Sequence, residues 1–139
     1  MCRKQNNLKS QLLRLLKNPN LAKQWIRIGI KSIKKEDFVR AMKSGFSPAR
    51  LLFNHFHCYI TNPVLRPLLQ MVFRAYWKEI EYYLTNVQRV YDLLWENPEL
   101  RDVLQTPEAK RYLNYWVAQA YVAMYEFTWL NKNPFGYES

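Results

Sequence analysis

The 139-residue sequence predicts an all-α fold, a helix bundle of about four helices preceded by a basic N-terminal helical arm. No segment alternates apolar and polar residues over the length that a strand would need. Asn-Pro-x-Leu occurs three times, starting at Asn18, Asn62 and Asn97. In this motif the asparagine can accept hydrogen bonds from the free N–H groups of a helix start, and proline fits the first helical position because no donor is needed there. Two long segments, 64–96 and 107–131, carry apolar residues at helical spacing.

These start signals and the apolar periodicity predict the helices in chain order. Their ranges are 7–17, 19–35, 36–44, 48–61, 64–96, 98–104 and 107–131. Residues 1–46 form the basic arm, residues 47–131 the helix-bundle body and residues 132–139 a C-terminal tail.

Two long helices are expected to organise the body. Within 64–96 apolar residues alternate in steps of four and three from Leu69 to Leu94, and within 107–131 they do so from Ala109 to Leu130. Helices with such seams pack nearly antiparallel. Both helices also carry apolar residues beside the seam, including Tyr82 and Trp129. A subunit interface would cover this surplus, and a thick core is the alternative.

Charge and aromatic residues divide the chain into two parts. Residues 1–50 hold 13 Lys and Arg and only two acids, Glu36 and Asp37, for a net charge of +11, whereas residues 51–139 hold eight Lys and Arg and nine acids. Of the 22 aromatic residues, only three precede residue 51. The pattern indicates a basic arm joined to an aromatic body.

One face of the predicted 19–35 helix is strongly basic. At 100° per residue, the cations Lys23, Arg27, Lys31, Lys34 and Lys35 fall on one side. The opposite side is apolar and includes Trp25 and four isoleucines. No acid is interleaved among the cations, so their mutual repulsion disfavours the isolated helix. A polyanion would remove this repulsion, whereas a solvated face is the alternative interpretation.

The length of the basic arm favours nucleic acid as the polyanion, because the cations of the arm continue over three predicted helices. The pattern lacks a recognition helix for reading bases, so contacts to phosphates are expected. A basic amphipathic helix containing Trp25 also fits the surface of an anionic membrane, which stays open as an alternative. The candidate nucleic-acid-binding residues are Arg3, Lys4, Lys9, Arg14, Lys17, Lys23, Arg27, Lys31, Lys34, Lys35, Arg40 and Lys43.

Catalytic and cofactor chemistry is not expected. The three glycines cannot form a phosphate-binding loop of either common type. On a helix His55 and His57 would point to opposite faces, as would Glu79 and Glu81, so neither pair makes a metal site or an acid–base pair. The sequence therefore predicts no enzyme, no metal and no cofactor. Two cysteines cannot make a disulfide framework and no CxxC occurs, which favours a protein that is intracellular or assembled inside a cell.

The C-terminal residues resemble those of a known group of proteins. Pro134, Gly136, Tyr137 and Ser139 match the Pro-x-Gly-Tyr-x-Ser ending of the major coat (capsid) proteins of filamentous and rod-shaped archaeal DNA viruses, the lipothrixvirus and rudivirus group. The chain length, the basic helical arm and the following helix bundle are also similar to that family.

The resemblance implies a structural virion protein, made in the host cell cytoplasm, that packages linear double-stranded DNA in a helical nucleoprotein filament. It also implies a homodimer or a heterodimer with a paralogous coat protein, DNA in the A form, contacts with neighbouring dimers and, in enveloped members, with a lipid layer. The alternatives are a non-specific chromatin-like or regulatory DNA-binding protein and a basic peripheral membrane protein.

Overall fold

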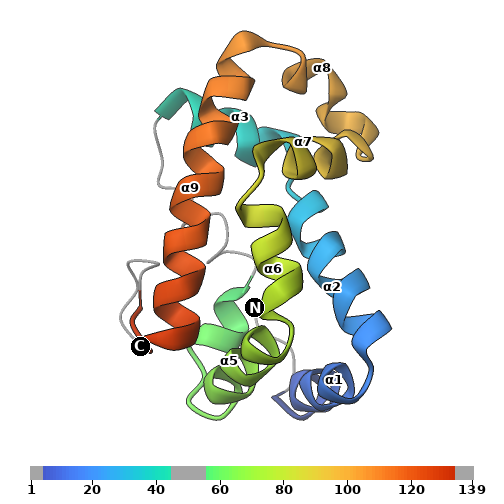
Figure 1. Ribbon diagram of the computed structural model, residues 1–139, viewed down its shortest axis with the longest axis vertical. Helices are drawn as coiled ribbons and strands as arrows, with labels where there is room; N and C mark the ends of the chain where they lie inside the picture. Colours follow the sequence, from blue (N-terminus) through green and yellow to red (C-terminus); the bar gives the residue numbers. More distant parts are fainter. Residues whose placement is uncertain (1–4, 45–55, 134–139) are drawn as a thin grey trace.

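The computed structural model describes residues 5–44 and 56–133, and these ranges contain helices but no strand (Figure 1). The all-α prediction is confirmed and a helix bundle fits the structure, but the expected number of about four helices is wrong. The described residues form eight α-helices, one short 3-10 helix and a further helical stretch at residues 56–60. The elements are α1 (Gln5–Lys17), α2 (Pro19–Lys31), α3 (Lys35–Ser44), α5 (Leu65–Ala75), α6 (Trp77–Leu84), α7 (Val87–Trp95), η1 (Pro98–Leu100), α8 (Arg101–Leu104) and α9 (Pro107–Trp129).

The long helix α9 runs along one side of the molecule, and α2 and α6 run roughly along the same direction beside it (Figure 1). At one end α1 packs on α5, and at the other end α2 meets α7 and α3 meets α9. Residues 56–60 form a helical turn before α5, whereas the rest of the predicted 48–61 helix lies outside the described residues.

The three N-terminal helices share the core of the body. Leu12 and Leu15 of α1, Ala22 of α2 and Phe38 of α3 are almost fully buried in the same apolar cluster as Trp116 of α9. The net charge therefore differs between the parts before and after residue 46, but the hydrophobic core includes residues from both parts.

The predicted 64–96 helix is broken into α5, α6 and α7. At the first break Tyr76 leaves helical geometry, with φ −116° and ψ 31°. Its hydroxyl donates to the carbonyl oxygens of Leu15 and Leu16, at 2.6 and 3.0 Å. These carbonyls belong to the last turn of α1, where no intrahelical donor is available. Tyr76 therefore ties the end of α1 to the junction of α5 and α6.

The second break lies at Thr85 and Asn86. Asn86 is extended, with φ −144° and ψ 106°, and its side chain accepts from the backbone N–H of Gln88 at 3.0 Å. Such a cap begins a new helix, and α7 turns across the end of α6 (Figure 1). The apolar seam nevertheless stays buried on both sides of the break, as Ile80 and Leu94 show.

The predicted 19–35 helix ends early. Helix α2 stops at Lys31, where the N–H of Ser32 donates to the Ile28 carbonyl oxygen at 2.9 Å, and α3 begins at Lys35. Lys34 and Lys35 therefore do not continue the α2 face, and the expectation of five cations along one helix is wrong.

Helix α9 confirms the prediction over 107–129. Thr106 caps its start by accepting from the N–H of Ala109 at 3.2 Å. Asn131 has a positive φ of 52°, which turns the chain so that the N–H of Lys132 donates to the Glu126 carbonyl oxygen at 3.0 Å. Within the described ranges, no helix combines the length and the apolar character needed to cross a bilayer.

Two α5 side chains seal the C-terminal end of α9. The Gln70 amide donates to the Phe127 carbonyl oxygen at 2.9 Å and to Asn131 Oδ1 at 2.8 Å, and Arg74 Nε donates to the Thr128 carbonyl oxygen at 2.9 Å. Last-turn carbonyls of α9 thus find donors on a different helix.

Cys58, on the helical turn before α5, is disulfide-bonded. Disulfides are typical of oxidising environments, so the number of cysteines no longer favours an intracellular protein or one that is assembled inside a cell, and this expectation stays a prediction.

Candidate nucleic-acid interface

The predicted basic residues are spread over three helices and fall into two groups, those in ion pairs and those without. Lys9, Arg14 and Lys17 lie on α1, Lys23, Arg27 and Lys31 on α2, and Lys35, Arg40 and Lys43 on α3, with Lys34 in the link before α3. Arg3 and Lys4 lie outside the described residues.

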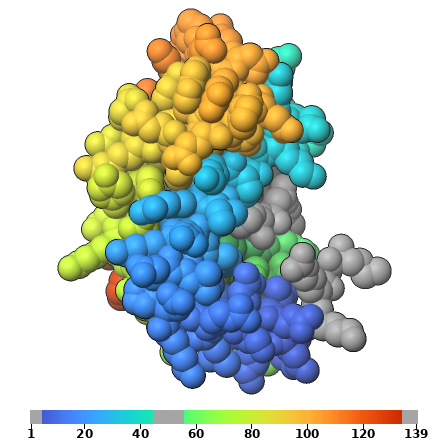
Figure 2. Space-filling model, turned by 90° about the vertical axis from the view of Figure 1, so that its right-hand side faces the viewer, coloured from blue at the N-terminus to red at the C-terminus, as the bar shows by residue number. Residues whose placement is uncertain are grey.

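Three of the predicted cations form ion pairs with acids of the body. Arg27 Nε lies 3.3 Å from Glu79 Oε2 on α6. Lys31 Nζ lies 3.1 Å from Glu96 Oε1 just after α7, and Lys35 Nζ lies 2.7 Å from Asp102 Oδ2 on α8. The helix α2 therefore turns part of its basic face toward α6 and α7. Figure 2 views the molecule from this side: α2, in lighter blue, borders α7 in yellow, whereas α1, in dark blue, lies at the bottom of the view.

The three acids were not predicted as parts of this surface. They follow their partners by 52, 65 and 67 residues, so only the folded arrangement of α6, α7 and α8 brings them to α2 and α3. We refer to these contacts as the ion-pair row: Arg27–Glu79, Lys31–Glu96 and Lys35–Asp102.

Two members of the ion-pair row have shifted pKa values. The hydrogen bond from Lys35 lowers the pKa of Asp102 below 3.8. Tyr83, and then Glu79, raise the pKa of the Arg27 guanidinium above its ordinary value. All three pairs have a partner with at least about a third of its side chain exposed, so solvent screens them and they contribute little to stability.

The other predicted cations remain available to a ligand. Lys9, Arg14, Lys17 and Lys23 are exposed and have no acidic partner among the described residues. Arg14 and Lys17 lie in the last turn of α1, where they also complement the negative end of the helix dipole.

The cations near α3 differ in their pairing. Lys34 and Lys43 are exposed and likewise have no acidic partner in the described part of the chain. Arg40 Nη1 lies 3.8 Å from Asp37 Oδ1 one turn earlier in α3, and both side chains are largely exposed. We call Lys9, Arg14, Lys17 and Lys23 the free basic surface, because they continue from α1 into α2 without an acid between them.

Sequence reasoning missed two further cations. Arg74 at the end of α5 and Lys78 at the start of α6 line a cleft of about 670 Å³ together with Lys23 and several aromatic side chains. The helical wheel of a single segment could not find this group, because the break at Tyr76 decides how α5 and α6 face α2.

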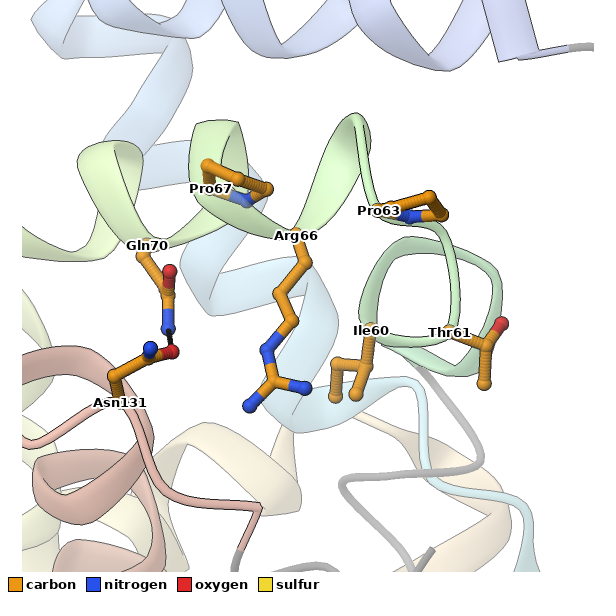
Figure 3. Close-up of a pocket in the computed structure, with 7 residues that line it drawn as sticks. All are labelled: Ile60, Thr61, Pro63, Arg66, Pro67, Gln70 and Asn131. Carbon is orange, nitrogen blue, oxygen red and sulfur yellow. Dashed lines mark hydrogen bonds between the residues drawn. The ribbon is translucent and has the colours of Figure 1, made fainter. Parts of the chain in front are cut away.

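A second hollow of about 520 Å³ lies between the start of α5 and the end of α9 (Figure 3). The Arg66 guanidinium points into it and lies 5.5 Å from the centre of the Phe127 ring. The hydrogen bond between Gln70 and Asn131 closes one side. Arg66, Gln70 and Asn131 are used in contacts between α5 and the end of α9, so we assign this hollow a structural role.

The acids considered for catalysis have structural partners. Glu79 pairs with Arg27, and Glu81 accepts a hydrogen bond from the Tyr121 hydroxyl at 3.2 Å. In the described ranges, no group of three metal-ligating side chains converges. His57 is exposed on the turn before α5, and His55 lies outside the described residues.

Comparison of the chain with protein-family models, curated proteins and solved structures gives no significant match. The resemblance to viral coat proteins therefore stays a prediction, and Pro134, Gly136, Tyr137 and Ser139, which carry it, lie outside the described residues.

Proposed function

We propose that this protein is a structural coat protein that binds linear double-stranded DNA through its phosphates and assembles along it as a helical filament. The observation that carries the proposal is the free basic surface. No acid occurs before Glu36 in the sequence, and the exposed cations Lys9, Arg14, Lys17 and Lys23 have no acidic partner among the described residues.

The dimensions of this surface suit a nucleic-acid backbone. Helices α1 and α2 have 13 residues each, so each is about 20 Å long. Duplex DNA carries about one charge per 1.7 Å of its axis, so such a surface meets several phosphates. Lysine and arginine contacts to phosphates position a protein without reading sequence.

The exposed apolar residues support assembly into a larger structure. On α9, Tyr115, Val122, Tyr125 and Trp129 each expose more than 40% of their surface and follow one another at helical spacing. A stripe of this kind is typical of a contact surface between proteins. In the proposed filament it joins neighbouring copies, whether the unit is a homodimer or a heterodimer with a paralogous chain.

The DNA-binding part is tested by the salt dependence of duplex affinity. Replacing Arg14, Lys17 and Lys23 with glutamine should flatten the slope of log affinity against log salt by about two to three units, since each neutralised phosphate contributes about 0.9. The matched control replaces Lys110, Arg111 and Lys132 with glutamine. This variant removes the same number of positive charges from residues outside the free basic surface. An equal change in the control would show that net charge alone, and not this surface, determines binding.

The coat part is tested by electron microscopy of the purified protein mixed with linear duplex DNA. Regular helical filaments are the expected result. Isolated complexes would favour a chromatin-like or regulatory DNA-binding protein instead. Binding to anionic vesicles without binding to DNA would favour a peripheral membrane protein.

A further inference from the structure

The cleft between α2, α5, α6 and the end of α9 combines positive charge with aromatic rings. Its lining includes Lys23, Arg74 and Lys78, together with Trp77, Tyr82 and Trp129. The volume of about 670 Å³ lies within the range of small-ligand sites. The three cations come from three different helices, so only the folded chain brings them together.

The cleft has an excess of positive charge. Its acid, Glu79, is held by Arg27 at 3.3 Å, and only 15% of the Glu79 side chain is exposed. Lys23 and Lys78 are exposed and have no acidic partner in the part of the chain that the structure describes. Arg74 donates from Nε to the Thr128 carbonyl oxygen, and its guanidinium carbon lies 6.0 Å from the centre of the Trp129 ring. It has no acidic partner among the described residues.

The aromatic rings of the cleft are fixed in place and partly open to solvent. Trp77 packs edge to face against Trp129, with their centroids 6.0 Å apart and their planes at 87°. Arg89 lies 3.8 Å from the centre of the Tyr82 ring. Even so, Tyr82 exposes 49% and Trp129 exposes 43% of its surface. Rings that are held in this way can receive a planar group without first being ordered.

We propose that this cleft binds a single-stranded segment of nucleic acid, with its phosphates on Lys23, Lys78 and Arg74 and a base stacked on Trp129 or Tyr82. Sites for single strands combine a positively charged groove with aromatic side chains that stack on unpaired bases. A duplex keeps its bases stacked inside and offers this cleft only phosphates. The concave shape also suits a flexible chain better than a flat bilayer surface.

The inference stands apart from the proposed duplex binding, because it depends on Trp129, Tyr82 and Lys78, which lie outside the free basic surface. Lys23 belongs to both surfaces. A strand that leaves a bound duplex along α2 would therefore reach the cleft directly.

The test titrates the full-length protein with fluorescein-labelled oligothymidylate of eight nucleotides and, in parallel, with a short duplex. Tryptophan fluorescence should be quenched by the single strand. The change Trp129→Leu should weaken single-strand binding about tenfold, since stacking on one ring contributes about 1–3 kcal/mol. Lys78→Gln should weaken it severalfold and flatten its salt slope by about one unit.

The controls are Tyr115→Leu, another exposed aromatic residue of α9, and Lys110→Gln, an exposed cation outside the cleft lining. Both should bind the single strand as the parent does, and circular dichroism should show all four variants folded. Duplex affinity should hardly change with Lys78→Gln, because Lys78 lies outside both the free basic surface and the exposed stripe of α9, so a failure of the cleft and a failure of the duplex surface are distinguishable.

Single-strand affinity that is unchanged by both Trp129→Leu and Lys78→Gln would overturn the proposal. So would displacement of the oligonucleotide by inorganic phosphate at equal phosphate concentration, because the cleft would then bind phosphate without stacking. If Trp129→Leu weakened binding to anionic phosphatidylglycerol vesicles and left oligothymidylate binding intact, a membrane would be the partner instead.

Discussion

At the scale of single residues, the ion-pair row puts three carboxylates where phosphates would otherwise meet Arg27, Lys31 and Lys35. Successive cations are four residues apart in the chain, which corresponds to about 6 Å where the backbone is helical. A polyanion that binds this surface must replace the three carboxylates or approach beside them. In the proposed complex with DNA, the acids would therefore reduce the number of cations that contact phosphates.

Removing these acids should strengthen DNA binding. In the triple variant Glu79→Gln, Glu96→Gln and Asp102→Asn, we expect tighter duplex binding and a salt slope steeper by up to about three units, because three cations become available. Fluorescence anisotropy over a series of salt concentrations measures both quantities.

A matched control separates this local effect from a change in net charge. The variant Asp92→Asn, Glu99→Gln and Glu108→Gln removes the same charges, but none of these acids pairs with the cations of α2 or α3. Equal gains in affinity from the two triple variants would contradict the role of the ion-pair row.

The titration of Asp102 reports directly on its contact with Lys35. Because the folded pKa is lowered below 3.8, the pair contributes stability above that pH and loses it as the pH falls through the lowered pKa. In Lys35→Gln we expect the pKa of Asp102 to rise, measured by carboxyl ¹³C NMR. An unchanged value would show that the 2.7 Å contact does not persist in solution.

Tyr112 should make the protein sensitive to alkali. Burial raises its pKa from 10.0 to about 12. The unfolded chain then loses this proton first, so stability falls as the pH rises from about 10 to about 12, by on the order of 2 kcal/mol. Tyr112→Phe retains the ring that packs edge to face on Phe38, and in urea unfolding at several pH values it should show a smaller alkaline loss than the parent.

At the scale of elements, α1 acts as part of the fold and not as a free arm. Leu12 is fully buried against the body, and α1 packs on α5. Leu12→Ala should therefore lower the free energy of unfolding by about 2–5 kcal/mol. The control Leu13→Ala, at a position that is 39% exposed, should cost much less in the same urea titration. Equal costs would mean that α1 does not pack in solution.

Helix starts were well predicted because a cap is a local feature. Asn18, Asn97 and Thr106 each accept a backbone hydrogen bond, from Leu21, Glu99 and Ala109 respectively. Asn62 also accepts from the N–H of Val64 at 2.8 Å. In each case proline and the capping side chain lie within a few residues, so the chain needs no tertiary contact to begin the helix there.

The break of the long central helix could not be predicted from its apolar seam, which continues through it. Asn86 was a usable signal, because asparagine favours caps over helix interiors. Tyr76 offered no such signal in the sequence. Its non-helical backbone accompanies the hydrogen bond from its hydroxyl to α1, and this contact exists only in the folded chain. The ion-pair row could not be predicted for the same reason, because its acids meet their partners only in the folded chain.

At the scale of the whole molecule, we propose that the outer face of α9 is the surface through which copies associate. Its stripe of Tyr115, Val122, Tyr125 and Trp129 stays more than 40% exposed, although Trp77 of α6 packs against Tyr125 and Trp129. We expect the protein to associate at micromolar concentration, and Val122→Lys should shift it toward the monomer in sedimentation velocity. Asn114→Lys, on α9 outside the stripe, is the control. A parent protein that is monomeric throughout would contradict this interface.

The seal that α5 places on the end of α9 has a consequence for local motion. A helix end whose carbonyls face water frays, and its amides exchange with solvent long before the protein unfolds. Here Gln70 and Arg74 hold the carbonyls of Phe127 and Thr128, so the last turn of α9 cannot open without also losing its contacts with α5. Amide protons in these two segments should therefore exchange with deuterium together, as one cooperative unit, and Gln70→Ala should uncouple them.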